Sequence, residues 1–204
     1  MTVTADLVKR LRDMTGAGYM DCRRALQETN GDLEQARVLL RERGLAAAAK
    51  RAGRTASEGL VEAYIHGGGR VGVLIEVNCE TDFVANTEDF KTLARDLAIQ
   101  VAGHNPQWVS RDDVPEEELA QERKIYETQA RDEGKPDSVT PRIVEGKLNA
   151  FLQERCLVEQ PFFRDLEGKH TVEDRIAEVA SKVGENIVVR RFVRFERGKD
   201  DAGG

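Results

Sequence analysis

The strongest constraint on the fold is a β-strand with one apolar face between residues 71 and 79. Every second residue along it is apolar, at Val71, Val73, Ile75, Val77 and Cys79. Successive side chains of a strand point to opposite faces, so this alternation predicts one buried face. A second β-prone segment, residues 60–65, precedes it across the glycine loop HGGGR, residues 66–70. Together they predict a hairpin whose register is fixed by the buried face.

Four helices and a further strand are predicted after the hairpin. The helix capped by Thr87 has the clearest apolar stripe, and the others begin near Pro115, Thr140 and Thr171. The β-branched and aromatic segment 186–195 predicts a returning strand. The fold class is therefore α+β, with a small, about three-stranded antiparallel sheet and packed helices.

The first part of the chain predicts a separate three-helix bundle. Glycines at 16 and 18 separate the first two helices, Asn30-Gly31 separates the next two, and Gly44 ends the third. The alanine-rich, basic stretch that follows is typical of a helical linker that frays into a loop. The expected organisation is a bundle at 1–44, a linker at 45–58, an α+β core at 59–197 and a disordered tail at 198–204.

Composition narrows the function class. The 204 residues carry a formal net charge of −6, which argues against a nucleic-acid partner, because phosphate binding needs a basic face. No apolar run approaches the length of a membrane span, so we expect no membrane partner. The three cysteines are far apart and odd in number, which indicates reduced thiols and a cytoplasmic protein.

No catalytic constellation is apparent in the sequence. GGGRVG, residues 67–72, matches a dinucleotide-binding pattern, but a strand follows it where that pattern needs a helix. His66 and Cys79 lack the orienting group that a thiolate pair requires. We therefore expect no enzyme activity, no cofactor and no metal site.

Two stretches suggest binding rather than chemistry. Tyr19 and Met20 lie beside a glycine turn, and the pattern fits equally a staple into the small core or an interaction surface. Thr81, Asp82, Phe83 and Val84 follow the buried strand. Either Asp82 caps a turn with Phe83 buried, or Phe83 is exposed for a partner. The pattern alone favours the first alternative.

Three long segments resemble bacterial elongation factor Ts. They are LVKRLRDMTGAGYMDCRRAL at 7–26, EVNCETDFVAN at 76–86 and GENIVVRRFVRFE at 185–196. GKP, VEGKL and LVEQPF, at 134–136, 144–148 and 157–162, fit as well. The resemblance covers nearly the whole chain and is to the short form of the family, with one copy of the core subdomain.

The resemblance implies a guanine nucleotide exchange factor for the GTPase elongation factor Tu. Such a factor binds the GDP form, displaces Mg²⁺ and promotes GDP release so that GTP can bind, without chemistry of its own. By motif position, the segment that dislodges Mg²⁺ is Thr81, Asp82, Phe83 and Val84. The resemblance thus implies that Phe83 is exposed and wedges into the partner, against the pattern-based preference.

The resemblance also implies contacts elsewhere in the chain. The N-terminal bundle, similar to a ubiquitin-associated (UBA) domain, would dock on the GTPase domain through Arg12, Tyr19, Met20 and Arg23. Gln100 stands where many members carry a histidine that contacts the GTPase. Val183 and Gly184 match a further contact point approximately.

Self-association is a further expectation. Some short-form members have a cysteine in the last strand that joins two subunits, and Val193 occupies that position here. We therefore expect a non-covalent homodimer, with the edge of strand 187–195 available for pairing. The alternative from another class is a UBA-like adaptor, which would bind a partner without affecting nucleotide exchange.

Overall fold

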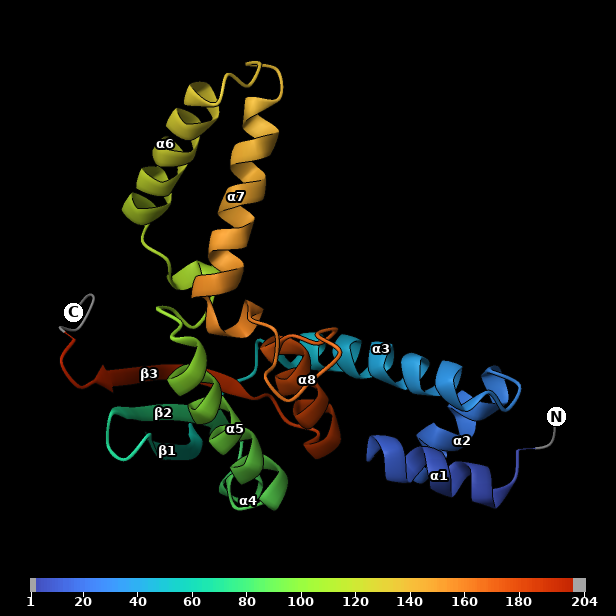
Figure 1. Ribbon diagram of the computed structural model, residues 1–204. Helices are drawn as coiled ribbons and strands as arrows, with labels where there is room; N and C mark the ends of the chain where they lie inside the picture. The colour runs from blue at the N-terminus through green and yellow to red at the C-terminus, as the bar shows by residue number, and fades with distance from the viewer. Residues whose placement is uncertain (1–2, 200–204) are drawn as a thin grey trace. The chain divides into compact units, whose positions relative to one another are not determined.

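The computed structural model describes residues 3–199, which form two units. The first unit contains the residues up to Leu60 together with Val77–Leu93 and Asp174–Val188. The second contains Val61–Glu76, Ala94–Glu173 and the residues from Val189 onward. The described part of the chain has eight α-helices, two short 3-10 helices and three strands, which confirms the α+β class (Figure 1).

The predicted N-terminal bundle is present in the first unit. Its helices are α1 (Ala5–Thr15), α2 (Tyr19–Glu28) and α3 (Leu33–Arg51). Thr4 and Asp32 cap α1 and α3 by accepting from backbone N–H groups three residues on. The buried residues of the bundle are Val8, Leu11, Cys22, Ala25, Leu26 and Ala36.

The predicted end of α3 at Gly44 is wrong. The helix continues to Arg51, because the run of alanines after Gly44 consists of the strongest helix formers. Packing against another helix, rather than a helix end, explains the glycine at position 44. A Cβ there would lie 3.1 Å from the Ser181 hydroxyl of α8 (Val172–Val183), so glycine permits close approach of α3 and α8. Arg41 and Asp174 add an ion pair of 3.0 Å between these two helices.

Much of the predicted linker is thus part of helix α3, and only a short stretch after Arg51 is irregular. The division into domains at 1–44, 45–58 and 59–197 stays a prediction. Of the predicted tail, residues 200–204 lie outside the described part of the chain.

The sheet has three antiparallel strands in the order β1 (Glu58–His66), β2 (Val71–Cys79) and β3 (Val188–Glu196). The end of β3 is joined to the start of β2 by the bond from Arg197 N–H to the Arg70 carbonyl, 2.9 Å. The central strand β2 is the predicted alternating segment. Its inward side chains are buried from Val73 onward, as expected, while Val71 is half-buried.

Helix α5 (Glu88–His104) carries the apolar stripe that was predicted. Phe90, Leu93, Leu97 and Val101 are fully buried. In the second unit, Arg95 of α5 pairs with Glu62 of β1 at 3.2 Å, and Arg194 of β3 donates to the Ala102 carbonyl. These contacts lay α5 across the face of the sheet to which Glu62 and Arg194 point.

Two long helices of the second unit, α6 (Glu116–Asp132) and α7 (Thr140–Arg155), run side by side as a helical hairpin (Figure 1). Ion pairs such as Arg123–Glu145 link them. Helix α6 is mostly exposed, with Ala130 its one buried residue. The remaining helices are α4 (Asp82–Ala85) and the 3-10 helices η1 (Arg111–Asp113) and η2 (Leu157–Glu159). No helix within residues 3–199 has the length and apolar character needed to span a membrane.

Gly59 at the start of β1 provides a test of the hairpin. Its φ is +143°, and a Cβ would lie 2.1 Å from the Val77 carbonyl oxygen. We expect Gly59→Ala to lower the free energy of unfolding by about 2–5 kcal/mol, through backbone strain and overlap. Gly53→Ala, where a Cβ meets nothing within 4 Å, should change it by about 0.5 kcal/mol or less. Urea unfolding measures both, and equal stability of the two variants would contradict the strand pairing described.

Candidate functional site

The candidate site is the turn that follows β2, residues Thr81, Asp82, Phe83 and Val84, here called the 81–84 turn. Thr81 has extended backbone angles, and its hydroxyl accepts from the Val84 N–H at 3.3 Å. It is therefore the N-cap of the single-turn helix α4. The pattern-based assignment of Asp82 as the cap is wrong, because Asp82 occupies the first helical position and its side chain is exposed.

The side chains of the short helix α4 differ strongly in exposure. Phe83 is 78% exposed, whereas Val84 is only 4% exposed and Ala85 is also buried. The burial of Phe83 that the pattern favoured is wrong, and the exposure that the family resemblance implied is confirmed. Val84 anchors the turn in the core, so Phe83 projects from a fixed point rather than from a loose loop.

A carboxylate from a distant part of the chain holds this turn. Both backbone N–H groups of Glu80 and Thr81 donate to one oxygen of Glu185 at 3.0 Å. The Thr81 hydroxyl donates to the other oxygen at 2.6 Å. Glu185 lies between α8 and β3, directly after the predicted contact residues Val183 and Gly184. Sequence reasoning missed it, because nothing in GENI indicates which segment its carboxylate contacts.

Cys79 lies beneath the turn, and its thiol is unreactive. Its thiol is fully buried and donates to the Thr81 carbonyl at 3.1 Å. Burial raises the pKa of the Cys79 thiol to about 11, and the Glu185 carboxylate adds to this rise. The thiol is therefore protonated at neutral pH and is a poor nucleophile. His66 has another partner, since its Nδ1 lies 3.0 Å from the Tyr64 hydroxyl.

The second candidate surface surrounds the turn between α1 and α2. Tyr19 is 46% exposed and Met20 is 60% exposed, so neither serves as a staple into the bundle core. Arg12 and Arg23 are exposed as well. Met14, at the end of α1, is a further exposed apolar side chain that sequence reasoning did not single out.

Gln100 does not lie on a surface. Its side chain is fully buried in the second unit, and it donates to the Gln160 side chain and the Pro161 carbonyl at 3.1 and 3.2 Å. Its oxygen accepts from the Phe163 N–H at 3.0 Å. A buried amide with these partners fixes the loop after η2 rather than contacting another molecule, so the burial disfavours a direct contact.

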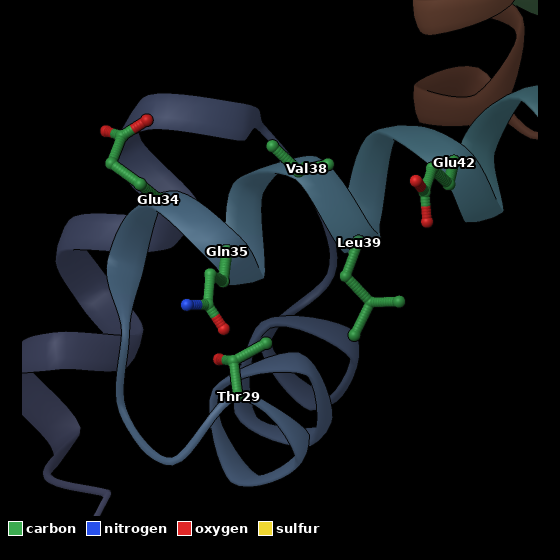
Figure 2. Close-up of a pocket in the computed structure, with 6 residues that line it drawn as sticks. All are labelled: Thr29, Glu34, Gln35, Val38, Leu39 and Glu42. Atoms are coloured by element: carbon green, nitrogen blue, oxygen red, sulfur yellow. The ribbon is translucent and has the colours of Figure 1, made fainter.

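A shallow groove on the bundle contains none of the predicted site residues (Figure 2). Its lining comes from the end of α2 and one face of α3: Thr29, Glu34, Gln35, Val38, Leu39 and Glu42. In the described part of the chain, no group of three His, Cys, Asp or Glu residues is arranged to hold a metal ion.

Comparisons with known proteins agree on one family. The family model described as "Elongation factor TS" matches residues 47–169. Elongation factor Ts of Moorella thermoacetica is 61% identical over 199 residues, covering 98% of this chain and 97% of the relative. Elongation factor Ts of Caldanaerobacter subterraneus is 59% identical over 197 residues, covering 97% and 98%. That of Coprothermobacter proteolyticus is 55% identical over 199 residues, covering 98% and 100%.

The burial contrast within the 81–84 turn gives a stability test on the free protein. We expect Phe83→Ala to change the free energy of unfolding by about 0.5 kcal/mol or less, because the ring is already in water. Val84→Ala should lower it by about 1–3 kcal/mol, because it leaves a cavity beneath the turn. Urea unfolding of both variants measures the difference. A Phe83→Ala protein destabilised more than Val84→Ala would place the ring in the core.

Proposed function

The chain belongs to the elongation factor Ts family, and from this premise we propose how its residues carry out the family's function. It is a guanine nucleotide exchange factor for elongation factor Tu in translation elongation. It binds the GDP form of that GTPase and promotes GDP release so that GTP can bind. Exchange needs no covalent step from this chain. We place it in the cytoplasm, where translation takes place.

The 81–84 turn is the element that displaces Mg²⁺ from elongation factor Tu, with Phe83 as the wedge. One observation carries this assignment: Phe83 is 78% exposed on a turn whose neighbours Val84 and Glu185 fix it in place. A rigid, exposed aromatic side chain is the usual anchor of a protein interface. Asp82 is exposed beside it and adds a negative charge at the same point.

The mechanism follows from linkage. Mg²⁺ bridges GDP phosphates and protein oxygens and is the largest local charge in a nucleotide site. A wedge that stabilises a GTPase conformation with misaligned Mg²⁺ ligands weakens GDP binding. By reciprocity, GDP weakens binding of the factor by the same ratio. A thousandfold loosening needs roughly 4 kcal/mol, which one buried aromatic and a few polar contacts can supply.

The N-terminal bundle supplies docking affinity. Its proposed contacts are Arg12, Tyr19, Met20 and Arg23, supported by their exposure around the α1–α2 turn. We also propose that the bundle is similar to a UBA domain. Gly184 is exposed next to Glu185, so Val183 and Gly184 remain proposed contacts near the 81–84 turn. Gln100 we assign to an internal positioning role, given its burial.

A non-covalent homodimer is the proposed assembly, and the uncovered face of the sheet supports it. Glu62 points toward α5, so its neighbours in β1 point away from that helix. Arg191 of β3 pairs with Glu76 of β2 on that outer face at 2.7 Å. The exposed apolar side chains that share the face are Val61, Ile65, Leu74, Val193 and Phe195.

A second copy of the chain is the proposed occupant of this outer sheet face. Two such faces packed together would bury apolar side chains from all three strands of each copy. This arrangement differs from pairing along the edge of β3, although β3 does lie at an edge of the sheet. Face packing buries more apolar surface than edge pairing, so we favour it.

Nucleotide release tests the wedge. Phe83→Ala should slow release of labelled GDP from elongation factor Tu by about tenfold or more, as expected for a central anchor worth roughly 2 kcal/mol. Asp82→Ala should show a weaker effect in the same direction. Leu166→Ala removes an apolar side chain that is 97% exposed and belongs to neither proposed surface, so it serves as the control. An adaptor would bind elongation factor Tu and leave GDP release unchanged in every variant, including the wild type.

Light scattering tests the homodimer. At micromolar concentration we expect about twice the 22.8 kDa chain mass, with or without reductant. Leu74→Glu should shift the mass toward one chain by placing a charge in the middle of the outer sheet face. Ile125→Glu, on the exposed side of α6, should leave the dimer intact. A wild-type protein of single-chain mass would remove the proposal.

A further inference from the structure

A polar cluster joins three separate segments of the first unit at the base of the 81–84 turn. Glu185 accepts three hydrogen bonds from Glu80 and Thr81, as described above. In return, the Glu80 carboxylate accepts from the Asn186 N–H at 2.7 Å. The turn after β2 and the turn between α8 and β3 therefore each provide a carboxylate that accepts hydrogen bonds from the other turn.

The third segment is the chain just after α3. The buried Asn186 side chain donates to the carbonyls of Ala52 and Arg54 at 3.4 and 2.8 Å. Arg54 in turn places its guanidinium 3.5 Å from the Glu80 carboxylate. Residues 185 and 186 thus fix both the exit from the bundle and the start of the 81–84 turn.

The contacts form a relay from Glu185 to Phe83. The Thr81 hydroxyl has one hydrogen, which it donates to Glu185, and its oxygen then accepts from the Val84 N–H. Glu185 therefore fixes the rotamer in which Thr81 caps α4. A helix of four residues is too short to be stable by itself, so its geometry depends on this cap. Phe83 lies on that helix.

We propose that Glu185 is a positioning residue for nucleotide exchange, holding Phe83 in the orientation that enters the partner by fixing Thr81. The inference rests on the proposed role of Phe83 as the wedge. A carboxylate suits this task, because three donors converge on its two oxygens and an ionised carboxylate can only accept hydrogen bonds. Glutamine at this position would offer one acceptor oxygen, so its NH₂ group would face either the two backbone N–H donors or the Thr81 hydroxyl, whose hydrogen would then lose its acceptor.

The test is GDP release from elongation factor Tu by Glu185→Gln, alone and combined with Phe83→Ala. We expect Glu185→Gln to lower the maximal release rate at saturating factor by about fivefold to tenfold, in line with the loss of charge-assisted hydrogen bonds. In the Phe83→Ala background the same substitution should change the rate less than about twofold, because residues acting through one group are not additive. Glu178→Gln, which alters an exposed glutamate of α8, is the matched control.

Amide hydrogen exchange of the free protein separates positioning from general destabilisation. The Glu80, Thr81 and Val84 amides should exchange faster in Glu185→Gln, while amides in the middle of β2 should keep their protection. Thr81→Val should reproduce the loss and be non-additive with Glu185→Gln, and Thr81→Ser, which keeps the hydroxyl, should lose less activity than Thr81→Val. The two single Thr81 variants leave Glu185 in place, so their comparison tests the relay even where Glu185→Gln folds poorly.

The outcomes separate the two hypotheses. Normal exchange by Glu185→Gln, together with impaired exchange by Phe83→Ala, overturns the positioning role and leaves the wedge intact. The positioning role is also overturned if Glu185→Gln slows GDP release by the same factor in the Phe83→Ala background, because Glu185 would then act independently of Phe83. Normal exchange by Phe83→Ala overturns the wedge itself, and the positioning role with it.

Discussion

The proposed functional geometry depends on the three hydrogen bonds that the Glu185 carboxylate accepts. Two backbone N–H groups and one hydroxyl at the end of β2 converge on it, at 2.6–3.0 Å. Without Glu185 these donors would depend on water, at the point where the strand ends and α4 begins. By accepting them, Glu185 ends the strand, sets the cap of α4 and fixes the turn to the segment that precedes β3. The exposure of Phe83 is a consequence of that geometry, since Val84 and Ala85 then face the core.

An exposed aromatic ring on a fixed turn is suited to binding a partner protein. The ring contributes little to the stability of the free chain, so its apolar surface remains available for a partner. Fixing the turn beforehand lowers the entropy lost on binding, and more of the contact energy can act on the partner's conformation. Exchange requires binding energy that is larger in the loosened state of the GTPase than in the GDP-bound state. A rigid wedge meets this requirement without any reactive group.

Local patterns predicted the regular elements well and the site less well. The alternation of β2 and the helical spacing of Phe90, Leu93, Leu97 and Val101 report burial directly, and the structure confirms both. Phe83 was misjudged from pattern alone, because residue type gives only an average tendency to be buried, whereas the cap at Thr81 decides which side of α4 faces the core. Gly44 looked like a helix end but allows close packing on Ser181. The contacts of Glu185 and the burial of Gln100 depend on residues about 100 and 60 positions away, so no local pattern contains them.

Phe83 is proposed to enter elongation factor Tu near its nucleotide site. A photoreactive phenylalanine analogue at position 83 tests this proposal most directly, by crosslinking to elongation factor Tu and mapping the adduct. We expect an adduct in the GTPase domain, beside the residues that hold Mg²⁺ and phosphate. We also expect the crosslinking yield to fall as the concentrations of GDP and Mg²⁺ are raised, because GDP and the factor weaken each other's binding. An adduct formed only between two copies of the chain, or a yield that is indifferent to GDP, would contradict this proposal.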